Sequence, residues 1–148
     1  MKGTPCYIGI AKSVKALVHY NLNTEIIDNE VDALIKMGTN YVLDHHLFQR
    51  LSDRKPITTH ILDIAYPPSY QMNIVELLEI AYLTGNMSDI RVTDALTEVM
   101  NKKNENQVWK INSVYKADGY ISFDKRGHKG DWVTYLIEKY LGVNHDLF

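Results

Sequence analysis

Apolar residues recur at helical spacing in five segments of the chain. In the first of these, 7–20, the apolar side chains lie three or four residues apart and form one stripe of a helix: Ile10, Val14, Leu17 and Val18. The same spacing predicts further helices over 24–46, 71–85, 88–103 and 131–141. Candidate N-caps and terminating glycines flank these segments: Asn23 or Thr24, Ser88, Asp131, Gly85 and Gly142.

The stretch 50–70 has no helical period. Pro56, Pro67 and Pro68 each remove a backbone donor and push the preceding residue out of the helical region. We therefore expect a long extended connection between the second and third helices.

The segment 109–132, between the last two helices, carries aromatic and charged residues in close alternation. Its parts 110–115 and 120–123 have apolar residues at a period of two, and the turn residues Ala-Asp-Gly lie between them at 117–119. The pattern predicts a small β-hairpin insertion within 109–124, with Trp109 and Trp132 packed at its base.

An internal repeat links the helices. An offset of 61 residues aligns six positions of the first two helices with the next two, including Val14 with Val75 and Asp28 with Asp89. An offset of 59 then aligns Leu77 with Leu136 in the last helix. The chain is interpreted as one domain, 1–148, built from helical hairpins at 7–46 and 70–103, the insertion, and one further helix. Such an incomplete array should expose apolar surface, which predicts either a homodimer or a missing N-terminal half covering its open end.

Composition narrows the function classes. The chain has 16 basic and 18 acidic residues, so no strong field favours nucleic acid or anionic membranes as partners. No apolar run is long enough for a membrane span or a signal peptide, which favours a cytoplasmic protein. Cys6 is the single cysteine, which suits a reducing compartment, and we expect it to be a small buried side chain.

Five phrases, taken in order, carry a family resemblance: PCYIGIAKSVKAL, YVLDHHLFQR, YPPSYQMNIVELLEIAYLTG, NKKNENQVWKI and GYISFDKRGHKGDWVTYLIEKYL. They resemble the C-terminal half of bacterial proteins related to squalene cyclases and protein prenyltransferases, over nearly the whole chain. The resemblance implies an all-α fold, a partial α/α toroid of stacked helical hairpins with about five main helices.

The functional motifs of that family are incomplete here. Its bracing Gln–Gly–Trp motif corresponds to 103–109, where Trp109 matches but Lys103 and Gln107 replace the Gln and the Gly. No DxDD-like acid segment occurs, and the only cysteine lacks the neighbours of a zinc-ligand set. We therefore assign no catalytic residue, metal ligand or cofactor, and whether the chain is an enzyme stays open.

Six residues are candidate ligand contacts: His45, Arg50, Tyr70, Trp109, Asp124 and Trp132. His45 is interpreted first as a polar helix cap and second as a ligand contact. It cannot share a metal ion with His46, because adjacent helical residues point about 100° apart. Asp124 is either a solvated strand residue or part of a site at the mouth of the array. His60 and His128 lie in loops, where position alone assigns no role.

Three functions remain open at this level. The first is a cyclase/prenyltransferase-like helical domain that is non-catalytic and binds an apolar ligand or a partner. The second is part of an enzyme acting on an isoprenoid-type substrate, with its catalytic half missing. The third is a helical scaffold for protein partners.

Overall fold

A computed structural model describes residues 6–114, 118–119 and 125–143. Five α-helices and one short 3-10 helix form the regular structure of these residues, and no strand occurs among them. In chain order they are α1 (Tyr7–Leu22), α2 (Asn29–Asp44), α3 (Ile74–Leu83), η1 (Ile90–Val92), α4 (Thr93–Asn101) and α5 (Asp131–Tyr140). The expected mostly helical fold with five main helices is confirmed.

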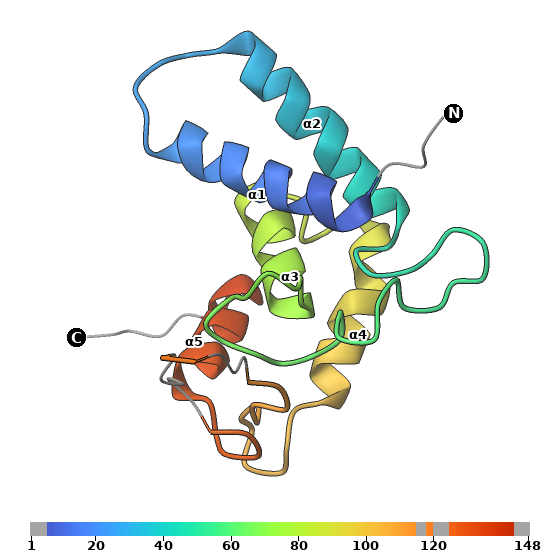
Figure 1. Cartoon of the computed structure of the whole chain (residues 1–148), viewed down its shortest axis with the longest axis vertical. Coiled ribbons are helices and arrows are strands. Elements are labelled where there is room, and N and C mark those ends of the chain that lie inside the picture. The colour runs from blue at the N-terminus through green and yellow to red at the C-terminus, as the bar shows by residue number, and fades with distance from the viewer. Residues whose placement is uncertain (1–5, 115–117, 120–124, 144–148) are drawn as a thin grey trace.

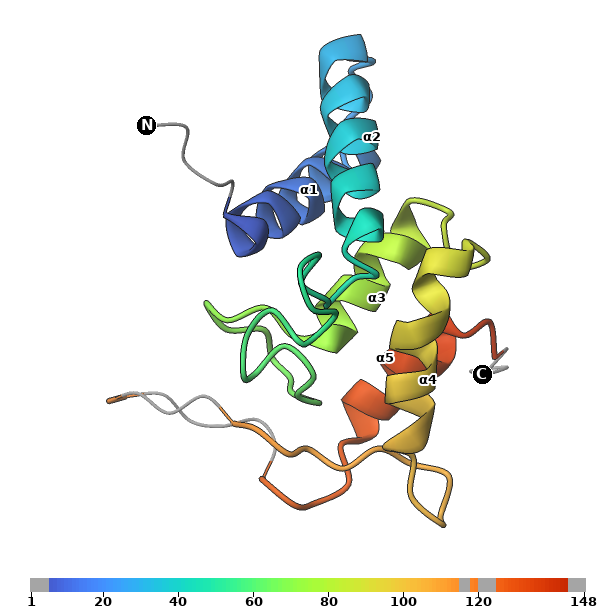
Figure 2. The same cartoon turned by 90° about the vertical axis from the view of Figure 1, so that its right-hand side faces the viewer.

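Helix α3 occupies the centre of the molecule, with α1 and α2 at one end and α4 and α5 toward the other (Figure 1; Figure 2). It is apolar nearly all round, because it packs against α1, α4 and α5 on different sides. Its buried residues are Ile74, Val75, Glu76, Leu77, Leu78, Ile80 and Ala81.

Polar contacts between α1 and α3 follow the repeat offset. Lys15 Nζ lies 3.0 Å from Glu76 Oε1, a residue 61 positions later, and His19 Nε2 lies 2.9 Å from Glu79 Oε1, 60 positions later. Since the contacts advance in the same direction along both helices, α1 and α3 run in the same sense where they touch. An aromatic contact joins α3 to α5, where the ring centroids of Tyr82 and Tyr140 are 5.2 Å apart.

Two aspartates 61 residues apart cap the start of α2 and the start of η1, the short 3-10 helix that leads into α4. The Asp28 carboxylate accepts hydrogen bonds from the backbone N–H groups of Glu30 and Val31 at the start of α2. Asp89 accepts one from Arg91 N at the start of η1. They are the side-chain caps in place of the predicted Asn23 or Thr24 and Ser88, so those predictions are wrong.

The start of α2 was predicted five residues too early, because two apolar residues before it extend the helical pattern. Ile26 and Ile27 are exposed, Ile27 by 88%, so these two apolar residues do not mark the buried face of a helix. Thr24 Oγ1 instead accepts a hydrogen bond from Ile26 N, 3.2 Å away, within the loop.

The predicted cap of α5 is also wrong. Asp131 is the first helical residue and forms an exposed ion pair with Lys129, whereas Gly130 takes the N-cap position without a side-chain bond. A Cβ at Gly130 would lie 2.6 Å from Val133 Cγ1 and 2.8 Å from Ile111 Cδ1, so a larger residue here would require these side chains to shift.

The connection between α2 and α3 contributes buried residues to the core and the N-cap of α3. Ile61, Ile64 and Met72 are buried in the core, and the Asn73 side chain caps α3 by accepting from Val75 N and Glu76 N. The expected irregular backbone is present here, but its apolar residues close one end of the helical core.

Two chain segments pair at the base of the predicted insertion. Ile111 N donates to His128 O over 3.0 Å, and Gly130 N donates to Trp109 O over 3.1 Å. The predicted strand residues 115 and 120–123 lie outside the described residues, so the hairpin stays a prediction. Trp109 is fully buried as expected, but Trp132 is 44% exposed and contacts Tyr66 and Tyr135. Trp132 therefore does not form part of a buried base.

One further prediction, which concerns the N-terminal end of α1, is wrong. Cys6, expected to be buried, is exposed and precedes the first helical residue. The buried position belongs to Tyr7, whose hydroxyl donates to the Leu47 carbonyl. Burial, and to a lesser degree the neighbouring Tyr41, raise the pKa of the Tyr7 phenol far above its ordinary value.

Candidate functional site

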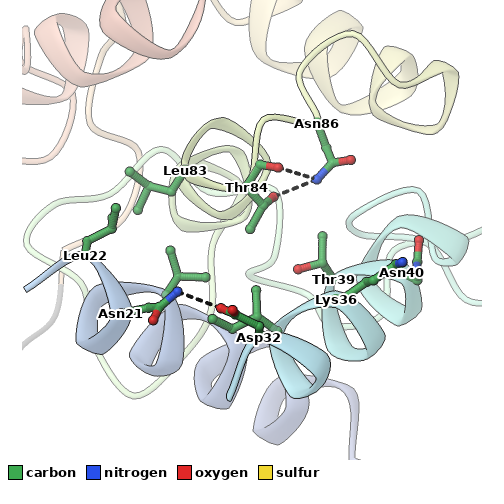
Figure 3. Close-up of a pocket in the computed structure, with 11 residues that line it drawn as sticks. Asn21, Leu22, Asp32, Lys36, Thr39, Asn40, Leu83, Thr84 and Asn86 are labelled. Carbon is green, nitrogen blue, oxygen red and sulfur yellow. Dashed lines mark hydrogen bonds between the residues drawn. The ribbon is translucent and has the colours of Figure 1, made fainter. Parts of the chain in front are cut away.

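A pocket of about 410 Å³ lies between α1, α2 and the C-terminal end of α3 (Figure 3). Its apolar lining comes from four aliphatic side chains: Val18, Leu22, Ile35 and Leu83. The polar lining is Asn21, Asp32, Lys36, Thr39, Asn40, Thr84 and Asn86. A concave, half-apolar site with a few polar groups is typical of small-molecule binding.

The two hairpin helices form this pocket because they approach closely at one point. Gly38 of α2 lies against Val14 of α1, and a Cβ at position 38 would collide with Val14 Cγ2. The absence of a side chain there lets the helices pack together, while Ile35 on α2 and Val18 on α1 line the adjoining pocket. Glycine at position 38 thus allows the short distance between α1 and α2 next to the pocket.

Thr39 is the most informative residue of the lining. It is 5% exposed, and its hydroxyl has no hydrogen-bond partner among the described residues. A threonine in a helix ordinarily satisfies its hydroxyl on a preceding carbonyl, and a buried unsatisfied hydroxyl costs about 1–3 kcal/mol. Thr39 therefore brings a hydrogen-bonding group without a described partner to the wall of the pocket.

Two of the three amide side chains that line the pocket already form hydrogen bonds with neighbouring groups. Asn21 Nδ2 donates to Asp32 Oδ1 over 2.9 Å, and Asn86 Nδ2 donates to the carbonyl and hydroxyl oxygens of Thr84, both at 2.9 Å (Figure 3). Lys36 forms no ion pair with any described residue. One carboxylate and one ammonium lie on the rim, so the pocket carries little net charge.

The lining combines aliphatic side chains with hydroxyl, amide and charged groups, and it includes no histidine, cysteine or serine. The pocket can hold an apolar body and offer one buried hydroxyl to a polar end.

His45 does not line this pocket, and its contacts are with the backbone and with neighbouring aromatic rings. It is the C-cap residue of α2, and its Nδ1 lies 2.8 Å from Gln49 O. Its ring lies between those of Tyr7 and Tyr41, with centroids 4.9 and 4.8 Å away. These contacts fit the polar-cap interpretation, although the buried Nε2 has no partner among the described residues.

The other predicted contacts do not converge. Arg50 pairs with Asp53 beside the loop hollow of 50–62, and Tyr70, 71% exposed, lies at two hollows near His60. Trp109 is sealed in the core, Trp132 lies on the surface of α5, and Asp124 falls outside the described residues.

Sequence reasoning also missed the ion-pair cluster between α1 and α3. Lys15 Nζ lies 3.0 Å from Glu76 Oε1 and 2.8 Å from Glu79 Oε2. Burial lowers the pKa of Lys15, but the hydrogen bonds and charges of the two glutamates outweigh it and raise the pKa above its ordinary value. The cluster ties α1 to α3, and the signal that could have found it was the 61-residue offset pairing Lys15 with Glu76.

Comparisons with known proteins found no match to this chain among family models, curated proteins or solved structures. Within the described residues, no three potential metal ligands gather in one place. The helices of this part of the chain are also too short or too polar to cross a bilayer.

Proposed function

We propose that this chain is a helical-hairpin domain that binds an apolar ligand with a single polar end, without catalysing its conversion. The observation that carries the proposal is the buried, unpartnered Thr39 hydroxyl at an aliphatic pocket of about 410 Å³. Apolar walls supply affinity through the area they remove from water, and the hydroxyl supplies orientation.

A partial α/α toroid with a hairpin insertion is the fold we propose for the chain. The consecutive contacts from α1 to α3 and from α3 to α5 support it, as do the equivalent caps Asp28 and Asp89. The pairing of Lys110 with Lys129 at the base of the insertion supports the hairpin. The sequence resemblance to cyclase and prenyltransferase relatives points in the same direction, and a pocket between hairpin helices suits an isoprenoid-like ligand.

A thermal-shift and calorimetric comparison with farnesol tests the proposed binding. A ligand at 100 times its Kd stabilises the folded state by about 2.7 kcal/mol, or roughly 5–10 °C for a chain of this length. Ile35→Trp should fill the pocket and abolish the shift. Ala33→Trp is the matched control, because Ala33 lies on the same helix but is exposed and does not line the pocket.

Thr39→Val tests the role of the hydroxyl at nearly constant volume. The variant should bind a hydrocarbon of equal length as well as the wild type does, but lose the preference for the alcohol. The proposal fails if farnesol shifts the melting temperature of neither the wild type nor the Ala33→Trp variant, or if farnesol binds Ile35→Trp as well as it binds the wild type.

A specific observation favours a partner-binding role in addition. Exposed apolar side chains gather on the first hairpin: Tyr20, Leu22, Ile26, Ile27, Leu34 and Met37. In a stack of hairpins, exposed apolar side chains at one end of the array are covered by a further hairpin, and we propose that a second copy of the chain covers these residues.

Mass measurement by light scattering during gel filtration tests this association. Ile27→Glu should convert a dimer to a monomer. Ile90→Glu should not, because Ile90 is equally exposed, at 80%, but belongs to the second hairpin. A monomeric wild type at high micromolar concentration would contradict the homodimer.

A further inference from the structure

A histidine–aspartate pair lies in the connection between α2 and α3, apart from the pocket of Thr39. His60 Nδ1 is 2.9 Å from Asp63 Oδ2. Because a carboxylate only accepts, the hydrogen on this bond belongs to Nδ1. The other ring nitrogen, Nε2, has no partner among the described residues, and half of the side chain is exposed.

The insertion holds this pair in place. Asn112 Nδ2 lies 3.4 Å from Asp63 Oδ1, while Asn112 Oδ1 accepts from Ile64 N over 2.6 Å and Asn112 N donates to Ile64 O over 3.1 Å. Three contacts from one asparagine therefore join the two connections. Both carboxylate oxygens of Asp63 are engaged, one by His60 and one by Asn112.

Three hollows meet at His60. One of about 360 Å³ is mainly apolar and contains Ile8 and Met72. A second of about 380 Å³ contains Asn112, Ser113 and Arg126, and a third of about 260 Å³ also includes His60. The imidazole thus lies between an apolar hollow and a polar one.

Two nitrogen groups in the polar hollow have no partner among the described residues: the Arg126 guanidinium, which only donates, and His60 Nε2, which donates when the ring is protonated. Arg126 pairs with no described residue, and the backbone bond from Gly127 N to Ile111 O, 2.7 Å long, fixes the chain beside it. The imidazolium form of His60 presents a second donor at Nε2, since Asp63 holds Nδ1. With the Asp63 oxygens engaged, these donors match the two oxygens of an anion.

We propose that this cluster is a binding site for an amphipathic organic anion, a carboxylate or a phosphate monoester. The anionic end contacts Arg126 and His60 Nε2, and the apolar body lies against Ile8 and Met72. The site is independent of the pocket of Thr39, since the two share no lining residue.

Calorimetry with octanoate, octyl phosphate and octanol tests the site and identifies the preferred anion. At least one of the two anions should bind the wild type roughly tenfold or more tightly than octanol, as expected when a charged group is recognised by charge-assisted hydrogen bonds. Arg126→Gln and His60→Gln should each weaken anion binding by roughly tenfold to a hundredfold. Lys129→Gln is the charge-matched control on the same connection and should bind as the wild type does.

The inference is overturned if neither anion binds, if octanol binds equally well, or if Arg126→Gln and His60→Gln both bind the anion as Lys129→Gln does. Ile35→Trp separates this site from the other pocket. It should leave anion binding unchanged, and loss of anion binding in that variant would also overturn the inference.

Discussion

Replacement of Trp109 by alanine should remove a large fraction of the stability of the fold. The indole is fully buried, its Nε1–H donates to Val99 O over 2.7 Å, and its backbone N–H donates to Thr134 Oγ1 over 3.2 Å. Truncation of a buried Trp costs about 3–5 kcal/mol, and the hydrogen bond to Val99 contributes about 1 kcal/mol of this. For a chain of this length, about 4 kcal/mol corresponds to a fall in Tm of roughly 10 °C.

Urea unfolding followed by circular dichroism measures the loss, with Trp109→Phe and Trp132→Ala as companions. Trp109→Phe keeps most of the ring volume but loses the N–H donor, so it should cost about 1–2 kcal/mol. Trp132→Ala deletes the same side chain at a half-exposed position and should cost less than about 1 kcal/mol. Equal losses for the two alanine variants would refute the argument that Trp109 anchors the insertion to α4 and α5.

Three further substitutions test local features. Gly38→Ala should cost about 1–3 kcal/mol in thermal unfolding, because the added methyl meets Val14, and a neutral result would mean that α1 and α2 can separate freely. Asp28→Ala should cost about 1 kcal/mol in urea unfolding through loss of the α2 cap, whereas an unchanged midpoint would place the helix start elsewhere. Hydrogen bonds from Arg91 lower the pKa of Asp89 to about 2, below its ordinary 3.8, so its stabilising effect is present above pH 3.8 and lost as the pH falls through 2. Asp89→Asn should flatten this acid limb, and carboxyl titration by NMR with a midpoint near 4 would contradict the assignment.

The helical part of the fold could be predicted from the sequence because its buried residues recur at a helical period. Val14 and Val18 on α1 and Val133 and Ile137 on α5 are all buried, as their three- and four-residue spacing requires. Helix ends were less readable, since capping depends on which of several polar residues reaches the free backbone donors. Asp28 and Asp89 were aligned by the repeat, yet that alignment alone did not reveal their role as caps.

The candidate sites could not be predicted in the same way, because they depend on distances between residues of separate elements. Thr39 and Ile35 look like ordinary positions of one helix, and only the approach of α1 and the end of α3 makes them part of a pocket. His60 and Asp63 are close in sequence, but Asn112, which fixes Asp63, comes from a connection about 50 residues away. A lone sequence offers no periodic signal for such a convergence.

The central position of α3 has a consequence for how the chain opens. Because α3 contacts α1, α4 and α5, and the buried apolar residues form one continuous cluster, the two hairpins and the last helix share a single core. Fraying should therefore be confined to the connections, while exposure of the α3 amides requires the loss of the whole domain. Hydrogen exchange from α3 would then report global unfolding, and the hairpin repeat visible in the sequence would not behave as a set of separately folding units.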